Sequence, residues 1–437
     1  MELKNTSFLP ASAINLIQEN NLKKMLSYLQ HFSPFYKNLF LVNNIRLDEI
    51  TSIADLVKIP TISKNEMQRA NWEFLCVPQN KVVDYCSTSG TLGTPVTIAL
   101  TENDLERLAI NEYGSFICAE GKSNDIFQLQ LTLDRQFMAG IAYYSGLRKL
   151  GAGIIRIGTG SPIIQWENIK KYNPTTLVGV PSLMLQLKDY VSELEADINT
   201  CSVKKLICIG ENIRQADFSL NTIGVKIQTD WDVQLFSTYA SSEMQTAITE
   251  CRAGKGGHLQ PELIIVEILN DQGFPLSDGE IGEVTITTLG VEGMPLLRYR
   301  TGDLCFKQSK PCVCGRNTIR LSPVLGRKQN MIKLKGTTLY PPALLDLLNG
   351  VEEIKEFHIE VFSNQNDLDE ITISVFPKSS ESNLIQKIRE LFQAKLRVTP
   401  NIQIVSFDVM QSLKHQSDSR KAHFFNDKRK KTSDTIN

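Results

Sequence analysis

DIFQLQLT, residues 125–132, is the first of a series of short apolar runs from which the fold can be predicted. The later runs are GIIRIG at 153–158, TTLVGVP at 175–181, KKLICIGE at 204–211 and VQLFSTYA at 233–240. Stretches with helical character, such as SLMLQLKDYVSEL, lie between them. Because this alternation is typical of parallel strands joined by crossover helices, we predict an α/β fold.

The segments on either side of this α/β stretch have different patterns. Upstream, Leu22, Met25, Leu26 and Leu29 recur at helical spacing and predict an amphipathic helix packed on the main body. Downstream of Glu262, the strand-like segments IIVEILN and GEIGEVTITTL alternate with turn clusters such as NDQG. We therefore expect an antiparallel subdomain that completes the body.

From about residue 327 the sequence predicts a separate, smaller unit. A helix (PPALLDLLNG), two strands, a second helix with Ile385, Ile388 and Phe392 on one face, and a strand (IQIVSF) follow in order. About a hundred residues suffice for a domain with its own core. We therefore divide the chain into a large N-terminal domain, 1–326, and a small α+β domain, 327–437, and we expect a frayed tail from Lys428 onward.

The bulk composition argues against several classes of function. With 47 basic and 48 acidic side chains among 437 residues, the formal net charge is -1, so no positive field favours nucleic acid or a membrane surface as a partner. No apolar run reaches the roughly 18 residues that a membrane helix needs, and the N-terminus does not read as a signal peptide. Nine cysteines in such a chain indicate a reducing compartment, so we expect a cytoplasmic protein.

Residues 87–95, STSGTLGTP, combine hydroxyl side chains with two glycines. Hydroxyls and main-chain N–H groups in such a loop can wrap a polyphosphate, although a Ser/Gly turn between strands is the simpler alternative. The loop lacks the Gly-Lys-Ser/Thr of a Walker loop, and Arg156 and Ile163 replace the third glycines of a dinucleotide-binding fingerprint. Kinase-like and Rossmann oxidoreductase functions therefore lose support.

Four further motifs follow this loop: CIGENIR at 208–214, TYASSE at 238–243, YRTGD at 299–303 and GRKQNMIKLKG at 326–336. As a set, and in this order, they resemble the adenylate-forming superfamily of acyl-CoA synthetases. The run PLLRYRTGDL, followed by a C-x-C-G-R segment, is similar to the phenylacetate-CoA ligase branch of that superfamily. The resemblance covers about residues 20–427, nearly the whole chain.

This resemblance implies a large adenylate-forming domain with mixed sheets and crossover helices, plus a small mobile α+β domain. It also implies that ATP converts a carboxylic acid to an acyl-adenylate, whose acyl group then passes to the thiol of coenzyme A. The positions that match the family's ATP-contacting residues are Ser87, Ser89, Gly90 and Thr91 for the β- and γ-phosphates, Gly210, Glu211 and Tyr239 for the adenine, Ser242 for the α-phosphate, Asp303 for the ribose, and Arg327 for the ribose and phosphate.

Glu243 matches the family's Mg²⁺ ligand, and a hard carboxylate oxygen suits that ion. Each of these residues has a plainer alternative when it is taken alone. Tyr239 is then a core residue, Glu243 a charge in the first turn of a helix, and Asp303 a turn former. Their joint occurrence favours the nucleotide site.

Lys421, in DSRKAHFFND, matches a family lysine that stabilises the negative charge developing as the carboxylate attacks the α-phosphate. Lys414 is the rival, and a solvated role for both lysines is a third alternative. The resemblance places a domain rotation at residues 327–330. It also places the pantetheine arm of the thiol beside Gly336, where a missing side chain leaves room.

Three positions depart from the family pattern. Thr94 stands where a lysine commonly precedes the proline, Gln329 where an aspartate often lies in the hinge, and Arg420 where a glycine precedes the catalytic lysine. These departures favour one alternative, a non-catalytic scaffold that binds a nucleotide. Two enzymatic alternatives are transfer to the phosphopantetheine of an acyl carrier protein in a natural-product pathway, and a ligase that adenylates a protein thiol or a cofactor. Assembly as a homodimer also stays open.

The acyl pocket of related ligases corresponds to QFMAGIAYYSG at 136–146. Its lining residues would be Phe137, Met138, Ala139, Gly140 and Tyr143, which could form a flat apolar slot. No positive side chain marks a second acidic group, so an aromatic or medium apolar monocarboxylate is the expected substrate. The alternative is a core segment between a strand and a helix.

Cys251, His258, Cys312 and Cys314 form a second group of chemically active side chains. Three thiolates and an imidazole fit a closed structural Zn²⁺ site, and the C-V-C-G knuckle brings two ligands close together. Phenylacetate-CoA ligase-like chains often retain such residues. The alternative is a set of reduced, buried thiols, the role that we expect for Cys305.

Overall fold

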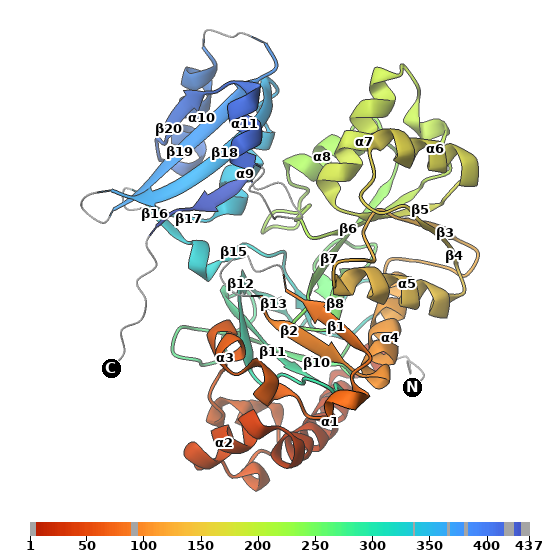
Figure 1. Cartoon of the computed structure of the whole chain (residues 1–437), viewed down its shortest axis with the longest axis vertical. Coiled ribbons are helices and arrows are strands. Elements are labelled where there is room, and N and C mark those ends of the chain that lie inside the picture. The colour runs from red at the N-terminus through yellow and green to blue at the C-terminus, as the bar shows by residue number, and fades with distance from the viewer. Residues whose placement is uncertain are drawn as a thin grey trace. The chain divides into compact units, whose positions relative to one another are not determined.

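The computed structural model describes residues 6–88, 95–334, 337–364, 368–379, 383–414 and 424–429. The chain forms two compact units, Met1–Val324 and Leu325–Asn437 (Figure 1).

The first unit begins with a helical layer. Helix α1 (Ala11–Phe32) buries Leu22, Met25, Leu26 and Leu29, the residues whose spacing predicted it. Helix α2 (Pro34–Val42) starts where Ser33 accepts a hydrogen bond from the Tyr36 amide. Helix α3 spans Lys64–Arg69. Short 3₁₀ turns connect this layer and later segments: η1 (Thr6–Phe8), η2 (Leu47–Glu49), η3 (Ile53–Lys58), η4 (Asn71–Phe74), η5 (Gln79–Lys81) and η6 (Ile198–Thr200).

A large mixed sheet forms the centre of this unit, with the strand order β13-β14-β9-β8-β7-β6-β5-β3-β4. Its parallel strands are β3 (Ile126–Leu129), β4 (Gly153–Arg156), β5 (Thr176–Gly179), β6 (Lys205–Ile209) and β7 (Gln234–Ser241). Its antiparallel strands are β8 (Thr246–Glu250), β9 (Gly257–His258), β13 (Lys307–Gln308) and β14 (Arg320–Leu321). The five apolar runs therefore form the parallel strands, as predicted.

Helices cover both faces of the parallel strands (Figure 1). They are α4 (Glu102–Cys118), α5 (Met138–Leu150), α6 (Pro162–Tyr172), α7 (Pro181–Glu193) and α8 (Thr222–Gln228). Val178 and Ile207 pack with residues of α4 and α5, whereas Leu177 and Leu206 pack with residues of α6, α7 and α8. Adjacent residues of each strand thus bury opposite faces, which explains the continuous apolar character of the runs.

An antiparallel sheet holds the second group of strands. Strand β11 (Gly282–Thr288) pairs with both β10 (Ile264–Leu269) and β12 (Tyr299–Cys305). The hairpin β1 (Asp84–Ser87) and β2 (Thr97–Leu100) is also antiparallel. The predicted antiparallel subdomain is therefore present.

The second unit is an α+β fold with its own apolar core. Its sheet has the order β20-β19-β18-β21. The elements are β15 (Gly326–Arg327), η7 (Lys328–Asn330), β16 (Ile332–Leu334), β17 (Thr337–Leu339), α9 (Pro341–Asn349), β18 (Ile354–Ser363), β19 (Asp369–Pro377), α10 (Leu384–Leu396), β20 (Asn401–Ile404), α11 (Phe407–Lys414) and β21 (Phe425–Asp427).

We expected the chain to fray from Lys428 onward, and this prediction is wrong for Lys428 and Arg429. The Lys428 amide donates to the Val361 carbonyl oxygen at 2.7 Å, and Arg429 forms ion pairs with Asp427 and Asp369. These contacts hold the chain against the sheet through Arg429, and residues 430–437 lie outside the described residues. In the part of the chain that the structure covers, no helix is long and apolar enough to cross a membrane.

Candidate active site and metal centre

Tyr239 and Asp303, which come from different sheets, meet directly. The Tyr239 hydroxyl, on β7, donates a hydrogen bond to Asp303 Oδ2, on β12, at 2.8 Å. Burial, and then the negative charge of Asp303, raises the pKa of Tyr239 well above its usual value, so the phenol stays protonated and remains a donor. This contact brings the TYASSE and YRTGD motifs to one place.

Glu243 lies in the tight turn that joins β7 to β8, not in the first turn of a helix. The turn is fixed by the Met244 amide, which donates to Ser241 Oγ at 3.2 Å, and by Gln245 Nε2, which donates to the Met294 carbonyl. Glu243 is 8% exposed, and Ser242 beside it is half-buried. The carboxylate is therefore held on a hydrogen-bonded turn directly after the strand that carries Tyr239.

Lys64, a residue that no motif singled out, lies beside this carboxylate. Its Nζ is 3.5 Å from Glu243 Oε1. The segment before it runs along β12: the Ile62 amide donates to the Arg298 carbonyl, and the Arg300 amide donates to the Ile62 carbonyl at 2.8 Å. Lys64, Glu243 and the strand of Asp303 therefore belong to one neighbourhood.

Gly210 and Glu211 follow β6 at the carboxyl edge of the parallel strands, where ligands bind in open α/β sheets. Gly210 has a φ of 73°, in the left-handed region that favours glycine. Glu211 accepts hydrogen bonds from the Ser182 amide at 3.0 Å and from the Ser182 hydroxyl at 2.9 Å. The carboxylate thereby anchors the start of α7 to the loop that contains Gly210.

Ser87 ends β1, at the base of the predicted phosphate loop. Its amide donates to the Gln136 carbonyl at 3.1 Å, which joins the loop base to the segment that leads into α5. The Thr88 amide donates to the Val96 carbonyl, and the Val96 amide donates to Thr88 Oγ1, so the loop is closed at its base. Ser89, Gly90, Thr91 and Thr94 lie outside the described residues.

The predicted acyl-pocket residues lie at the start of α5. Met138 and Tyr143 are buried in two different core clusters, and Phe137 and Ala139 are half-buried. A Cβ atom at Gly140 would lie 2.1 Å from the Thr132 carbonyl oxygen, so any side chain there would clash with the backbone. The glycine therefore allows the loop after β3 to pass across the first turn of α5.

In the second unit, Arg327 is in β15 and Gln329 is in η7. Lys414 ends α11, where its Nζ donates to Glu356 Oε2 at 3.0 Å and lies 4.5 Å from the centre of the Phe424 ring. These contacts bind Lys414 within its own unit. Gly336, Arg420 and Lys421 lie outside the described residues.

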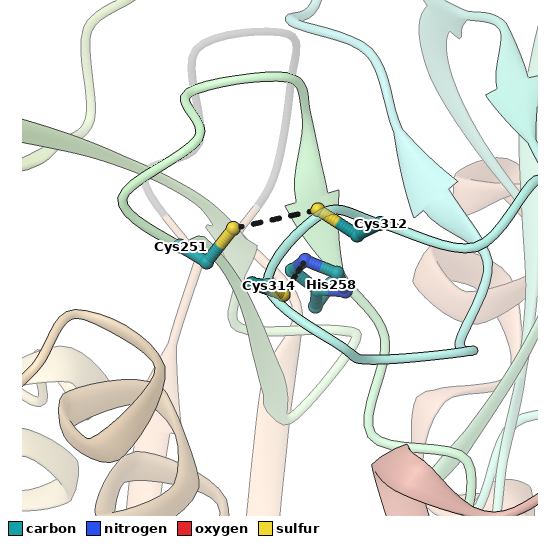
Figure 2. A group of neighbouring side chains, drawn as sticks. All are labelled: Cys251, His258, Cys312 and Cys314. Carbon is teal, nitrogen blue, oxygen red and sulfur yellow. Dashed lines mark hydrogen bonds between the residues drawn. The ribbon is translucent and has the colours of Figure 1, made fainter.

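Cys251, His258, Cys312 and Cys314 converge (Figure 2). Their ligand atoms lie within 4.8 Å of one another. Cys251 Sγ and Cys312 Sγ are 3.7 Å apart, and Cys314 Sγ and His258 Nε2 are 3.5 Å apart. A tetrahedral zinc ion with ordinary bond lengths has S···S edges of about 3.8 Å and S···N edges of about 3.5 Å. The donor set and its spacing therefore fit zinc.

The surroundings of the cluster favour metal ligation by two of its four donors, His258 and Cys314. His258 Nδ1 contacts Thr318 Oγ1 at 3.0 Å, which leaves Nε2 for the cluster. Burial, and then the charges of Arg316 and Arg320, lower the pKa of His258 to about 3, so the imidazole is neutral. Burial alone would raise the pKa of Cys314, but hydrogen bonds from the Arg316 backbone and side chain outweigh it and lower the pKa. Both features favour metal ligation.

All nine cysteines are free thiols in this structure, and Cys305 is fully buried as expected. A disulfide needs an S–S bond of about 2.05 Å, which the 3.7 Å separation between Cys251 and Cys312 excludes. Sequence reasoning missed Lys64 and Thr318. No local signal marks either residue, because their partners lie far away in the chain.

The sequence of this chain is similar to a known enzyme family and to ligases of known function. A family model described as AMP-binding enzyme matches residues 47–293. The chain is 27% identical over 375 residues to a phenylacetate-coenzyme A ligase of Thermus thermophilus, with 84% of this chain and 82% of that protein covered. It is 26% identical over 410 residues to a phenylacetate-coenzyme A ligase of Escherichia coli, with 91% and 90% covered.

Among solved structures, a 2-hydroxyisobutyryl-CoA ligase in its postadenylation state matches with a TM-score of 0.84. The sequence identity is 18%, and the match covers 97% of this chain and 91% of that one. At this identity the likeness shows the fold alone.

Proposed function

Because the chain belongs to the family of AMP-binding enzymes, we propose that it is an AMP-forming acid–thiol ligase that resembles phenylacetate-CoA ligases. In the first half-reaction, a carboxylate and ATP give an acyl-adenylate and pyrophosphate. In the second, the thiol of coenzyme A attacks the acyl carbon and AMP leaves. The observation that carries this proposal is the hydrogen bond from Tyr239 to Asp303, which joins two nucleotide motifs from separate sheets.

Within this site, each residue receives a role from its chemistry. Asp303 accepts hydrogen bonds from the ribose hydroxyls, and Tyr239 holds that carboxylate in place. Gly210 and Glu211 flank the adenine, with Glu211 fixed by Ser182. Ser242 contacts the α-phosphate, and Ser87, Ser89, Gly90 and Thr91 bind the outer phosphates.

Glu243 supplies a hard carboxylate oxygen that suits Mg²⁺, on a hydrogen-bonded turn where the residue is largely buried. The ion would neutralise phosphate charge. Through that ion, Glu243 would help to position the polyphosphate relative to Ser242.

The small unit supplies the remaining groups. Because Lys414 is bound to Glu356 and Phe424, we assign the catalytic lysine to Lys421 rather than to Lys414. Arg327 contacts the ribose and phosphate. A rotation of the small domain at residues 327–330 then replaces Lys421 beside the substrate with a channel for the thiol, next to Gly336. Gln329 is compatible with a rotation, which needs torsional freedom rather than a carboxylate.

We propose that the carboxylic acid substrate is aromatic or of medium size and apolar. Phe137 and Ala139 are half-buried at the start of α5, close in sequence to Gln136, whose carbonyl binds the Ser87 amide. Met138, Gly140 and Tyr143 support that turn from the core. The described residues 136–146 include no lysine or arginine, and an apolar site of this composition suits a monocarboxylate with a flat side group.

The test is ATP-pyrophosphate exchange with a panel of acids, followed by AMP release in the presence of coenzyme A. We expect exchange with phenylacetate or another aromatic acid, and AMP release that depends on coenzyme A. Exchange without a response to coenzyme A, but with a response to a holo-carrier protein, would identify the carrier alternative. No exchange with any acid would favour the scaffold alternative.

Lys421→Ala separates the two half-reactions. Because Lys421 stabilises charge at the α-phosphate, we expect adenylation to be lost and thiol transfer from a synthetic acyl-adenylate to persist. Lys414→Ala is the matched control, since that lysine is held within the small unit. Equal loss of both half-reactions in Lys421→Ala would contradict the assignment.

We also propose that Cys251, His258, Cys312 and Cys314 bind a structural zinc ion. Four protein donors leave no open coordination position, which is typical of structural rather than catalytic zinc. Elemental analysis of protein purified without chelators is expected to give one zinc per chain. A content near zero would remove the proposal.

A further inference from the structure

Lys64 lies in a position that its local structure does not explain. It is the first residue of α3, where a positive side chain is disfavoured by the helix dipole. The helix start is already capped by Ser63 and Glu66: Ser63 Oγ accepts from the Asn65 amide, and the Ser63 amide donates to Glu66 Oε2 at 3.0 Å. Lys64 is therefore not needed to begin the helix.

The side chain of Lys64 instead extends to Glu243. The two side chains are 21% and 11% exposed, and Nζ lies 3.5 Å from Glu243 Oε1. A mostly buried lysine loses hydration and side-chain freedom, so an ion pair of this kind contributes little net stability. The pairing of Ile62 with β12 nevertheless holds the chain so that the amine reaches the site.

The ammonium group has the chemistry of a phosphate ligand. It carries three donors, and one carboxylate oxygen does not use them all. A compact positive charge suits phosphate oxygens. With Mg²⁺ at Glu243, the charge of the carboxylate would be shared with the ion, and Lys64 could then contact the neighbouring phosphates.

We propose that Lys64 is a catalytic residue that binds the β- and γ-phosphates of ATP and the pyrophosphate that leaves. This inference rests on the proposed adenylation reaction. In that reaction, a bond forms between the carboxylate oxygen and the α-phosphorus. The bond from the α-phosphorus to the bridging oxygen breaks, and its electron pair stays on pyrophosphate. The ammonium group of Lys64 stabilises that charge.

Nucleotide binding tests the proposal without knowledge of the acid. Lys64→Met removes the charge and keeps most of the side-chain volume. We expect the affinities for Mg²⁺-ATP and pyrophosphate to fall by about tenfold to a hundredfold, while the affinity for AMP, which lacks the outer phosphates, changes less than twofold. Lys64→Arg is expected to retain part of the ATP affinity.

Lys58→Met is the matched control. Lys58 forms an ion pair with Asp55 at 2.7 Å on η3, and 47% of its side chain is exposed. We expect this variant to bind ATP, pyrophosphate and AMP as the wild type does. Thermal unfolding of both variants shows whether either substitution disturbs the fold.

Kinetics complete the test. In Lys64→Met we expect acid-dependent ATP-pyrophosphate exchange to fall by about a hundredfold in kcat/KM, with thiol transfer from a synthetic acyl-adenylate retained. Unchanged ATP and pyrophosphate affinity, or an equal loss of AMP affinity, would overturn the proposal. A wild type that binds ATP but shows no exchange with any acid would contradict the proposed function, and a selective loss of ATP affinity would still support Lys64 as a phosphate ligand.

Discussion

Among single residues, Tyr239 is expected to affect ATP binding through its hydrogen bond to Asp303. Tyr239→Phe removes the donor that holds the Asp303 carboxylate at 2.8 Å and leaves the ring in place. We expect the KM for ATP to rise by about twofold to tenfold, because the Asp303 carboxylate then loses one of the hydrogen bonds that orient it. Exchange kinetics at varied ATP measure this change.

Tyr28→Phe is the control for this substitution. The Tyr28 hydroxyl donates to the Glu292 carbonyl at 2.9 Å, outside the proposed nucleotide site. If Tyr28→Phe raised the KM for ATP as much as Tyr239→Phe, a general loss of packing would explain both results and the role of Tyr239 would be refuted.

The sequence identified some site residues and missed another for a physical reason. Tyr239, Glu243 and Asp303 stand in short polar motifs, so residue types and their order were enough to single them out. Lys64 stands in TISKNEM, which reads as an ordinary helix start. Its position beside Glu243 arises only when Ile62 pairs with β12, which is a tertiary contact.

At the scale of elements, the first turn of α5 depends on close backbone approach. Gly140→Ala would place a Cβ atom 2.1 Å from the Thr132 carbonyl oxygen. We expect the free energy of unfolding to fall by about 1–3 kcal/mol, and we expect the KM for the acid to rise because α5 must move. Chemical denaturation and exchange kinetics measure the two effects.

Gly160→Ala is the matched control for the substitution at Gly140. A Cβ atom at Gly160 has no neighbour closer than 3.7 Å, which is ordinary van der Waals contact. We expect little change in stability or in the KM for the acid. An equally small effect of Gly140→Ala would show that the loop after β3 adapts easily.

Element prediction succeeded where a segment carries its own pattern. The five apolar runs became β3 to β7. The central strands β5 and β6 bury side chains on both faces of the sheet, whereas the edge strand β4 is only partly buried. The short strands β9, β13 and β14 have two residues each, which is too short for an alternating apolar pattern to show in the sequence. They are strands only because they pair with neighbouring strands of the sheet. Strand β21 was missed because its position depends on parallel pairing with β18.

At the scale of the whole molecule, the zinc cluster is expected to join distant parts of the first unit. Cys251 follows β8, His258 is in β9, and Cys312 and Cys314 lie between β13 and β14. Cys314→Ser is expected to release zinc and to lower the Tm of the first unit by at least about 5 °C. Calorimetry and zinc analysis measure both changes.

Cys201→Ser is the control for the metal ligand. Cys201 is half-buried and does not belong to the four-residue cluster. We expect it to leave zinc content unchanged and to have a smaller effect on Tm. Full zinc content in Cys314→Ser would contradict the assignment of that thiolate as a ligand.

The division into two units predicts how separate fragments of the chain behave. Residues 325–437 contain their own apolar core, including Ile359, Ile373 and Phe392, and the four-stranded sheet closes upon it. We expect this fragment to unfold cooperatively when it is produced alone, because a core of this kind is sufficient for an independent domain. The fragment 1–324 retains Tyr239, Glu243 and Asp303 but lacks Lys421, so it is expected to bind ATP and to lose acid-dependent exchange by more than about a hundredfold. Restoration of exchange when the two fragments are mixed would show that the small unit supplies a catalytic group, whereas full exchange by 1–324 alone would show that adenylation needs nothing beyond the first unit.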